Sequence, residues 1–275
     1  MIRIDMHVHS IYSDGTYTPD ALACAAKARG LTFITLTDHD TTDGLLDFDI
    51  ACRRHGVQSL NGVELSAEAP YTLHILGYRL KPGTRALERR LEFIREHRNQ
   101  RNLEICRKLR EHGLDIVYAD VAAEAHGFVI ARPHIARALM KKGYVSSIGE
   151  AFAKYLSVGT PGYVQRERLT PRECIELIIE AGGLPVLAHP AQTKLTGRDF
   201  EDLICRLKDY GLWGIEAKYS KNSVYQNYDY LQEAKRFGLY PTAGSDFHGH
   251  PGQTIQLGID VDENLLPWAR LGLSI

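Results

Sequence analysis

The chain has 275 residues, of which 44% are hydrophobic and 24% are charged. This composition is ordinary for a globular protein that buries a core, as one large α/β domain or as a domain with an insertion. The 33 Lys and Arg residues nearly balance the 34 Asp and Glu residues, so the bulk charge argues against a polyanion partner.

The five cysteines are scattered, odd in number and form no Cys-x-x-Cys pair. This usage indicates reduced thiols and disfavours both a disulfide framework and a zinc knuckle. The chain opens with strand-like residues, so we expect no signal peptide, and no apolar run approaches membrane-spanning length. We therefore expect a cytoplasmic protein without a membrane partner, and no obligate protein partner is evident.

Residues 2–9 alternate between apolar and polar side chains, which is the pattern of a β-strand. Side chains two residues apart share one face of a strand, so His7 and His9 should point together, with Asp5 beneath them. Two imidazoles at one strand end make half of a divalent-metal site. A lone His-x-His pair is more often simply polar, so the rest of the chain must decide.

Strands and helices then alternate. Thr18-Pro19-Asp20 is typical of a helix start, and Gly30 is placed to end that helix. The pattern predicts helices over 18–29 and 42–55 and strands over 31–37, 57–64 and 72–80. Strands separated by helices indicate right-handed crossovers and a parallel sheet.

This alternation stops at a turn near residue 82, and one long helix is predicted over 84–112. It has two apolar stripes, Leu87, Leu91 and Ile94 in the first and Leu103, Cys106 and Leu109 in the second. The stretch 95–102 between them is wholly polar, so the helix either bridges a cleft or exposes a solvated turn. Further helices are predicted over 133–142 and 147–155. We interpret 82–165 as a helical insertion into a domain formed by 1–81 and 166–275.

The alternation resumes at residue 170. A helix is predicted from Thr170-Pro171 to Gly182, followed by helices over 199–210 and 225–237. Strands over 184–188, 212–217 and 239–244 bring the total to seven. The tail over 258–275 is uninformative.

Histidines and carboxylates lie at or near the ends of most of these strands. In a parallel barrel the carboxyl ends of the strands meet on one face, where active sites lie. Imidazole and carboxylate ligands suit Mn²⁺, Fe²⁺ or Zn²⁺, and the absence of thiolates argues against a closed structural zinc. The candidates exceed what one ion needs, and they are His7, His9, Asp14, His39, Glu64, His74, His189, Asp246 and His248.

Together these motifs resemble the PHP (polymerase and histidinol phosphatase) family, and within it the stand-alone phosphoesterase branch that includes nucleoside 3′,5′-bisphosphate phosphatases. The match covers almost the whole length, including 132–137 in the insertion. The residues that carry it are His7-x-His9, Thr37-Asp38-His39-Asp40, Gly62-Val63-Glu64, His74, Ala188-His189-Pro190 and Gly244-Ser245-Asp246-Phe247-His248.

The resemblance implies a distorted seven-stranded (β/α)7 TIM-like barrel and three divalent metal ions, with Mn²⁺ as first choice and Fe²⁺ or Zn²⁺ as alternatives. Carried over residue by residue, the first ion takes His7, His9, Glu64 and Asp246, the second Glu64, His74 and His189, and the third Asp14, His39 and His248. Asp246 also counts among the predicted catalytic residues. Paired metals would activate water and stabilise the charge that develops on a transferred phosphoryl group.

Two residues of the insertion are our first choice for binding substrate phosphate, Arg132 and His134, and His134 could also protonate the leaving oxygen. The plain alternative for both is a surface position at a helix N-terminus. Arg98, Arg101 and Lys218 are weaker phosphate candidates. Asp5 could orient His7, or it could be an ordinary strand-end residue.

The favoured function is a phosphoesterase that acts on a small phosphorylated nucleotide, either a 3′,5′-bisphosphate or the 5′ end of a short RNA. The alternative is a cyclic phosphodiesterase that opens a ribose cyclic phosphate. A structural PHP module of a DNA polymerase would not need the intact ligand set, and an amidohydrolase would usually need a carbamylated lysine or another histidine pattern.

Overall fold

The computed structural model describes residues 1–275 apart from 82, 126–129, 166–167, 251, 253 and 274–275. Its centre is one sheet with the strand order β7-β6-β5-β4-β3-β2-β1-β8. The strands are β1 Ile2–Val8, β2 Phe33–Leu36, β3 Gln58–Ser66, β4 His74–Tyr78, β5 Leu184–Leu187, β6 Gly214–Tyr219, β7 Tyr240–Gly244 and β8 Ile259–Val261.

The two ends of this sheet meet at β1. Its first half pairs antiparallel with β8, through Ile2 to Ile4. Its second half meets the end of β7, where the His9 N–H donates to the Phe247 carbonyl at 2.9 Å and the Asp246 N–H donates to the His7 carbonyl at 2.8 Å. The predicted α/β barrel is therefore confirmed as a nearly closed barrel. The sheet has eight strands rather than seven, because part of the tail forms β8.

The expectation of a parallel sheet is wrong for β4, which runs antiparallel to both β3 and β5. Only residues 67–73 separate β3 from β4, which is too short for the helical crossover that parallel neighbours need. Because β4 runs backwards, its first residue lies at the same edge as the last residues of its neighbours. His74 pairs in register with Ser66, the last residue of β3.

The predicted helices of the barrel are present, with ends shifted by a few residues. Thr18 caps the first helix by accepting from the Ala21 N–H at 3.1 Å, and Thr170 and Glu173 form a capping box. Their apolar sides pack on the sheet. They are α1 Pro19–Ala28, α2 Leu45–His55, α7 Pro171–Glu180, α8 Gly197–Asp209 and α9 Val224–Phe237. A short 3-10 turn over Pro190–Thr193 and the tail helix α10 Trp268–Leu271 were not predicted.

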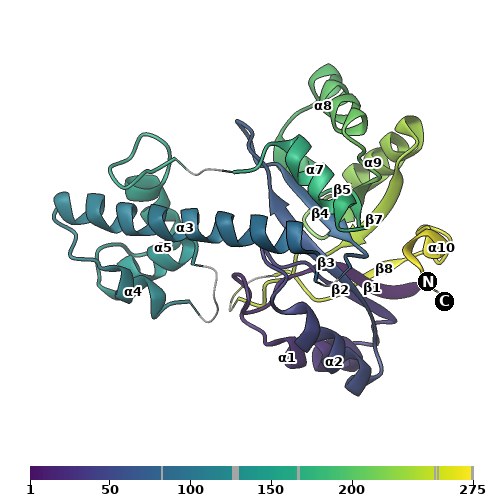
Figure 1. Ribbon diagram of the computed structural model, residues 1–275, viewed down its shortest axis with the longest axis horizontal. Helices are drawn as coiled ribbons and strands as arrows, with labels where there is room; N and C mark the ends of the chain where they lie inside the picture. Colours follow the sequence, from purple (N-terminus) through teal and green to yellow (C-terminus); the bar gives the residue numbers. More distant parts are fainter. Residues whose placement is uncertain (82, 126–129, 166–167, 251, 253, 274–275) are drawn as a thin grey trace.

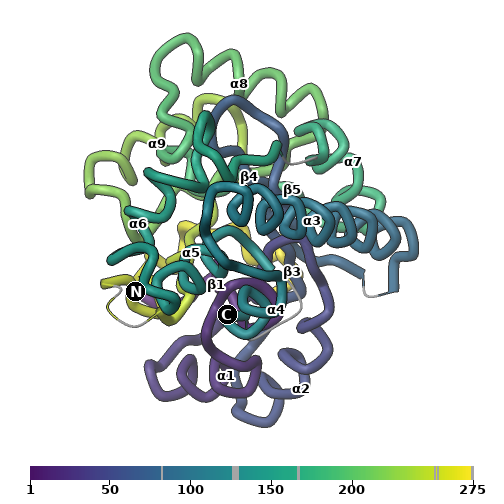
Figure 2. The backbone as a smooth tube through the Cα atoms, turned by 90° about the vertical axis from the view of Figure 1, so that its left-hand side faces the viewer, coloured from purple at the N-terminus to yellow at the C-terminus, as the bar shows by residue number. Residues whose placement is uncertain are grey.

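The long helix α3, Arg85–Glu111, leaves the barrel and carries a second lobe (Figure 1). In this lobe it is joined by α4 Tyr118–Ala122, α5 Arg132–Lys141 and α6 Ile148–Ala151, which continues as a π-helix over Phe152–Leu156. Seen from the side of the lobe, α3, α4 and α5 lie in front of the barrel strands (Figure 2). The predicted boundaries at 82 and 166 lie outside the described residues, so this division stays a prediction.

Both ends of α3 are buried in different hydrophobic clusters. Leu87, Leu91 and Ile94 pack into a cluster with the barrel helices. Ile105, Cys106 and Leu109 pack into the core of the lobe. Leu103 was predicted for this stripe but is 45% exposed, because its position is rotated away from the 105/109 face of the helix. In the described part of the chain, no helix is both long and apolar enough to cross a membrane.

Candidate active site

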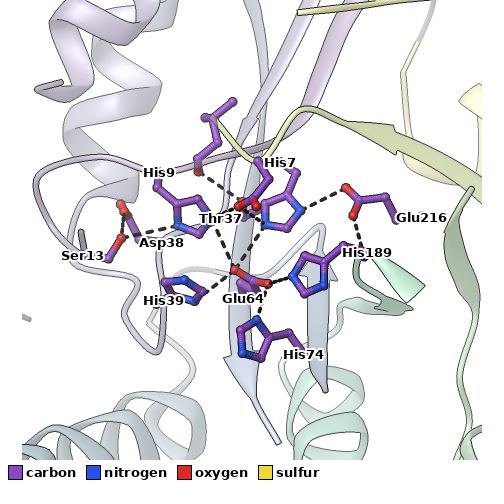
Figure 3. Close-up of polar contacts among 12 residues, drawn as sticks. His7, His9, Ser13, Thr37, Asp38, His39, Glu64, His74, His189 and Glu216 are labelled. Carbon is purple, nitrogen blue, oxygen red and sulfur yellow. Dashed lines mark hydrogen bonds and ion pairs between the residues drawn. The ribbon is translucent and has the colours of Figure 1, made fainter. Parts of the chain in front are cut away.

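The carboxylate of Glu64, at the end of β3, lies at the centre of five imidazole rings (Figure 3). Its Oε1 lies 2.8 Å from His74 Nδ1 and 2.9 Å from His189 Nε2. Its Oε2 lies 3.2 Å from His7 Nε2, 3.3 Å from His9 Nε2 and 3.0 Å from His39 Nδ1. Glu64 has no exposed surface.

Two aspartates extend this cluster. Asp246 Oδ1, after β7, lies 3.3 Å from His9 Nε2 and 3.5 Å from His248 Nδ1. Asp14 Oδ1, in the loop after β1, lies 3.2 Å from His248 Nε2. The structure thus brings all nine predicted ligands together. Three sets could each hold an ion, with ligand atoms within 4.8 Å of one another, and they are His7, His9, Glu64 and Asp246; His9, Asp14, His39 and His248; and His39, Glu64 and His74.

Four buried nitrogen and oxygen atoms of this cluster indicate that it can bind cations. His7 Nε2, His9 Nε2, His39 Nδ1 and Glu64 Oε2 have no hydrogen-bond partner among the described residues. Buried polar atoms are normally paired, because an unpaired one costs about 1–3 kcal/mol. Lone pairs of imidazole and carboxylate that converge without hydrogen bonds suit a shared cation, so the donor set fits divalent metal ions.

The electrostatics of the cluster agree with this reading. Burial raises the pKa of Glu64, but His39, His7 and His74 outweigh it and hold that pKa well below its usual range. Burial lowers the pKa of His74 to about 4, so its ring is neutral at neutral pH. Burial also lowers the pKa of His9, but the contacts of its ring with the Asp246 and Glu64 carboxylates raise it to about 10. A proton held on His9 must therefore leave before a cation binds to that ring.

Asp5 does not orient the His7 ring. It accepts hydrogen bonds from the backbone N–H groups of His7 at 3.2 Å and Ser245 at 2.8 Å, so it joins β1 to the end of β7. The carboxylate that contacts Nδ1 of the His7 ring is that of Glu216 on β6, whose Oε1 lies 3.0 Å away. Glu216 was not among the predicted residues, although an acidic residue between Ile215 and Ala217 in a buried strand is a signal that the sequence offers.

A cavity of about 640 Å³ opens beside Asp14, His39 and His74, towards the insertion. Three of the predicted phosphate-binding residues line it. Arg101 Nε donates to the Val164 carbonyl at 2.8 Å, and Arg132 donates to the Leu156 carbonyl at 3.1 Å. Arg98 is buried and ion-paired with Asp40. Arg168, which was not among the predicted residues, also lines the cavity.

The two remaining candidates, His134 and Lys218, are not among the residues that line this cavity. His134 is 2% exposed, and its Nδ1 accepts a hydrogen bond from the Ala131 N–H at 2.8 Å. Burial lowers the pKa of His134 to about 4, so at neutral pH the ring is uncharged and carries its proton on Nε2. Lys218 lies in β6, while the nearby Lys221 has its Nζ 3.1 Å from Asp246 Oδ2. The substrate roles of these residues stay predictions.

Comparison with known proteins decides the family. The model of the PHP domain matches residues 5–163, which is more than half of the chain. The chain belongs to the PHP family. This confirms the resemblance that the sequence motifs indicated.

Two PHP relatives align over most of their own length. A 3′,5′-nucleoside bisphosphate phosphatase of Chromobacterium violaceum is 36% identical, over 92% of this chain and 89% of the relative. A 5′-3′ exoribonuclease of Haemophilus influenzae is 34% identical, over 98% of both chains. A solved structure described as an amidohydrolase from C. violaceum, with bound sulfate and no metal, superposes with a TM-score of 0.88 at 34% identity, covering 98% of this chain and 95% of that one. The PHP chain described here is an enzyme, a metal-dependent phosphoesterase.

Proposed function

We propose that this enzyme hydrolyses a phosphate ester of a small phosphorylated nucleotide, either a nucleoside 3′,5′-bisphosphate or the 5′ end of a short RNA. The observation that carries the proposal is the Glu64 cluster, which opens into a cavity lined by arginines of the insertion. A cavity of about 640 Å³ is in the range of small-ligand sites. The names of the two relatives support both substrates.

Three divalent ions are proposed for the cluster, Mn²⁺ first and Fe²⁺ or Zn²⁺ as alternatives. When bound, such ions supply a Lewis acid and lower the pKa of water to near neutrality. His7, His9, Glu64 and Asp246 would hold the first, Glu64, His74 and His189 the second, and Asp14, His39 and His248 the third. The short contacts of His74 and His189 with the same Glu64 oxygen support the second set.

The chain's own residues would bind and orient the substrate. Arg101 and Arg132 are each held by a backbone carbonyl, which fixes their guanidinium groups at the cavity wall before substrate arrives. His134, with its proton on Nε2, could donate a hydrogen bond to a phosphate or leaving oxygen. Arg98 and Lys218 remain weaker candidates. The five free cysteines suit a reducing compartment, so a cytoplasmic location stays part of the proposal.

The test combines metal analysis with phosphate release from a panel of nucleoside 3′,5′-bisphosphates, short 5′-phosphorylated RNAs and ribose cyclic phosphates. We expect two or more ions per chain under metal-replete conditions, and turnover of a bisphosphate or an RNA 5′ end. Turnover restricted to cyclic phosphates would replace the proposed substrate with the alternative. At most one bound ion would refute the multinuclear site.

A further inference from the structure

Strand β6 supplies none of the nine predicted ligands, yet its side chains contact three ligand residues. The carboxylate of Glu216 joins two of them. Its Oε1 lies 3.0 Å from His7 Nδ1, and its Oε2 accepts a hydrogen bond from the backbone N–H of His189 at 2.6 Å. Glu216 and His7 have no exposed surface, and His189 is 3% exposed.

The contact with His7 selects one form of its ring. A carboxylate accepts hydrogen bonds only, so His7 Nδ1 must carry a proton and donate it to Glu216. The lone pair that can bind a cation is then on Nε2, which lies 3.2 Å from Glu64 Oε2 inside the ligand cluster. A carboxylate behind an imidazole also makes the ring a stronger electron donor.

Tyr219, three residues further along β6, holds the carboxylate of Asp246 in one orientation by a hydrogen bond. Gln192 Nε2 donates to the Tyr219 hydroxyl oxygen at 2.9 Å, and that hydroxyl donates to Asp246 Oδ2 at 2.8 Å. The amide donor sets the direction of the chain of hydrogen bonds. Oδ2 is thereby engaged, and Oδ1 is left facing the His7 and His9 rings.

The backbone leaves little freedom for this arrangement. Gly244, at the end of β7, lies between β6, which carries Glu216, and β1, which carries His7. A Cβ atom at Gly244 would come within 2.3 Å of the His7 Cβ and 2.6 Å of Glu216 Oε1. Only a residue without a side chain permits so close an approach of β7 to both groups. Glu216 and His7 are therefore held against each other.

We propose that β6 positions the metal ligands of this enzyme, with Glu216 fixing the ring form of His7 and Tyr219 fixing the carboxylate of Asp246. The proposal rests on the ligand assignment made under the proposed function. It makes Glu216 and Tyr219 positioning residues, because they touch ligands and not the substrate. The expected consequence is a change in metal affinity.

The experiment measures the Mn²⁺ dissociation constant by competition with a fluorescent chelator. Glu216→Gln should weaken Mn²⁺ binding about 10- to 100-fold, the usual effect of losing such a partner. Tyr219→Phe should weaken it about tenfold, the value of one hydrogen bond to a charged group. Excess Mn²⁺ should restore kcat in both variants. The matched controls are Glu201→Gln, an exposed carboxylate paired with Arg236, and Tyr228→Phe, which is 60% exposed.

Both controls should bind Mn²⁺ as the parental protein does. Mn²⁺ affinity in Glu216→Gln and Tyr219→Phe equal to that of the controls would overturn the proposal. If Glu216→Gln does not fold, Tyr219→Phe decides, because it removes one hydroxyl group. A parental protein that binds no Mn²⁺ would refute the ligand assignment and this proposal together. Since no phosphoester is used in the binding assay, the substrate proposal is tested separately.

Discussion

The ion pair between Arg98 and Asp40 connects the polar middle of α3 to the mouth of the barrel. Both side chains are almost fully buried, at 6% and 1% exposure. Asp40 lies beside His39 and also accepts a hydrogen bond from the Ser66 N–H at 3.0 Å. We therefore expect Arg98 to stabilise the attachment of α3 to the barrel, in addition to lining the cavity.

Replacing Arg98 by Met removes the cation that pairs with the buried Asp40 carboxylate. Breaking one partner of a buried pair costs about 3–5 kcal/mol. Because Asp40 keeps its bond to Ser66, we expect the lower end, about 3 kcal/mol, in urea unfolding of the metal-free protein. Arg95→Met is the matched control. Arg95 lies on α3 one turn before Arg98, and it pairs with Asp43, which is 42% exposed. That surface pair is worth less than about 1 kcal/mol.

A second variant distinguishes the effect of the buried Asp40 charge on stability from the effect of the lost Arg98 contact. Arg98→Met combined with Asp40→Asn removes both charges, and should recover most of the lost stability. If Arg98→Met costs no more than Arg95→Met, the pair does not hold α3 and the reasoning fails. If stability is unchanged while KM for the substrate rises, Arg98 is mainly a substrate contact, as the sequence first indicated.

Three further predictions test the site. Arg132→Ala should weaken turnover of the phosphorylated nucleotide about ten- to a thousandfold, the value of one or two charge-assisted bonds, and barely affect a small aryl phosphate. Equal losses would place Arg132 at the reacting phosphate. Glu64→Gln should lower kcat more than any other single ligand change and remove more than one ion by metal analysis; loss of one ion or none would contradict a shared ligand. Mn²⁺ affinity should rise with pH, because the pKa of His9 is raised to about 10 and its proton must leave before metal binds. Calorimetry in two buffers should detect that release, and binding without it would contradict this role.

That the nine candidate ligands lie together could be predicted from the sequence because the relevant signals are local. Hydrophobic runs mark the strands, and the polar residue that follows each run marks the strand end. His74 was the exception, since it begins its strand. The short connection over 67–73 explains this, because it permits only an antiparallel neighbour, and that reverses which end of β4 faces the mouth.

The residues that the sequence did not reveal depend on contacts between distant parts of the chain. Glu216 lies 209 residues from His7, and no local pattern links them. β8 has three residues, which is too short for alternation to be recognised, and it pairs with β1 over Ile2 to Ile4, at the other end of the chain. The pairing of Arg98 with Asp40 likewise requires the position of α3 over the barrel.

The backbone around the cluster is held in an unusual conformation at three positions. Asp40, His189 and Asp246 have positive φ angles of 52°, 25° and 59°, and all three lie just beyond strand ends. Such angles cost a residue other than glycine about 1–3 kcal/mol each, so the surrounding structure must enforce them.

Hydrogen bonds at these same residues provide that enforcement. The Asp40 N–H donates to the Glu64 carbonyl at 2.9 Å, and the Asp246 N–H donates to the His7 carbonyl at 2.8 Å. The His189 N–H donates to Glu216 at 2.6 Å. These bonds use only protein atoms, so they do not depend on a bound cation. The strained turns, and with them the directions of the ligand side chains, are therefore built into the folded chain before any metal arrives.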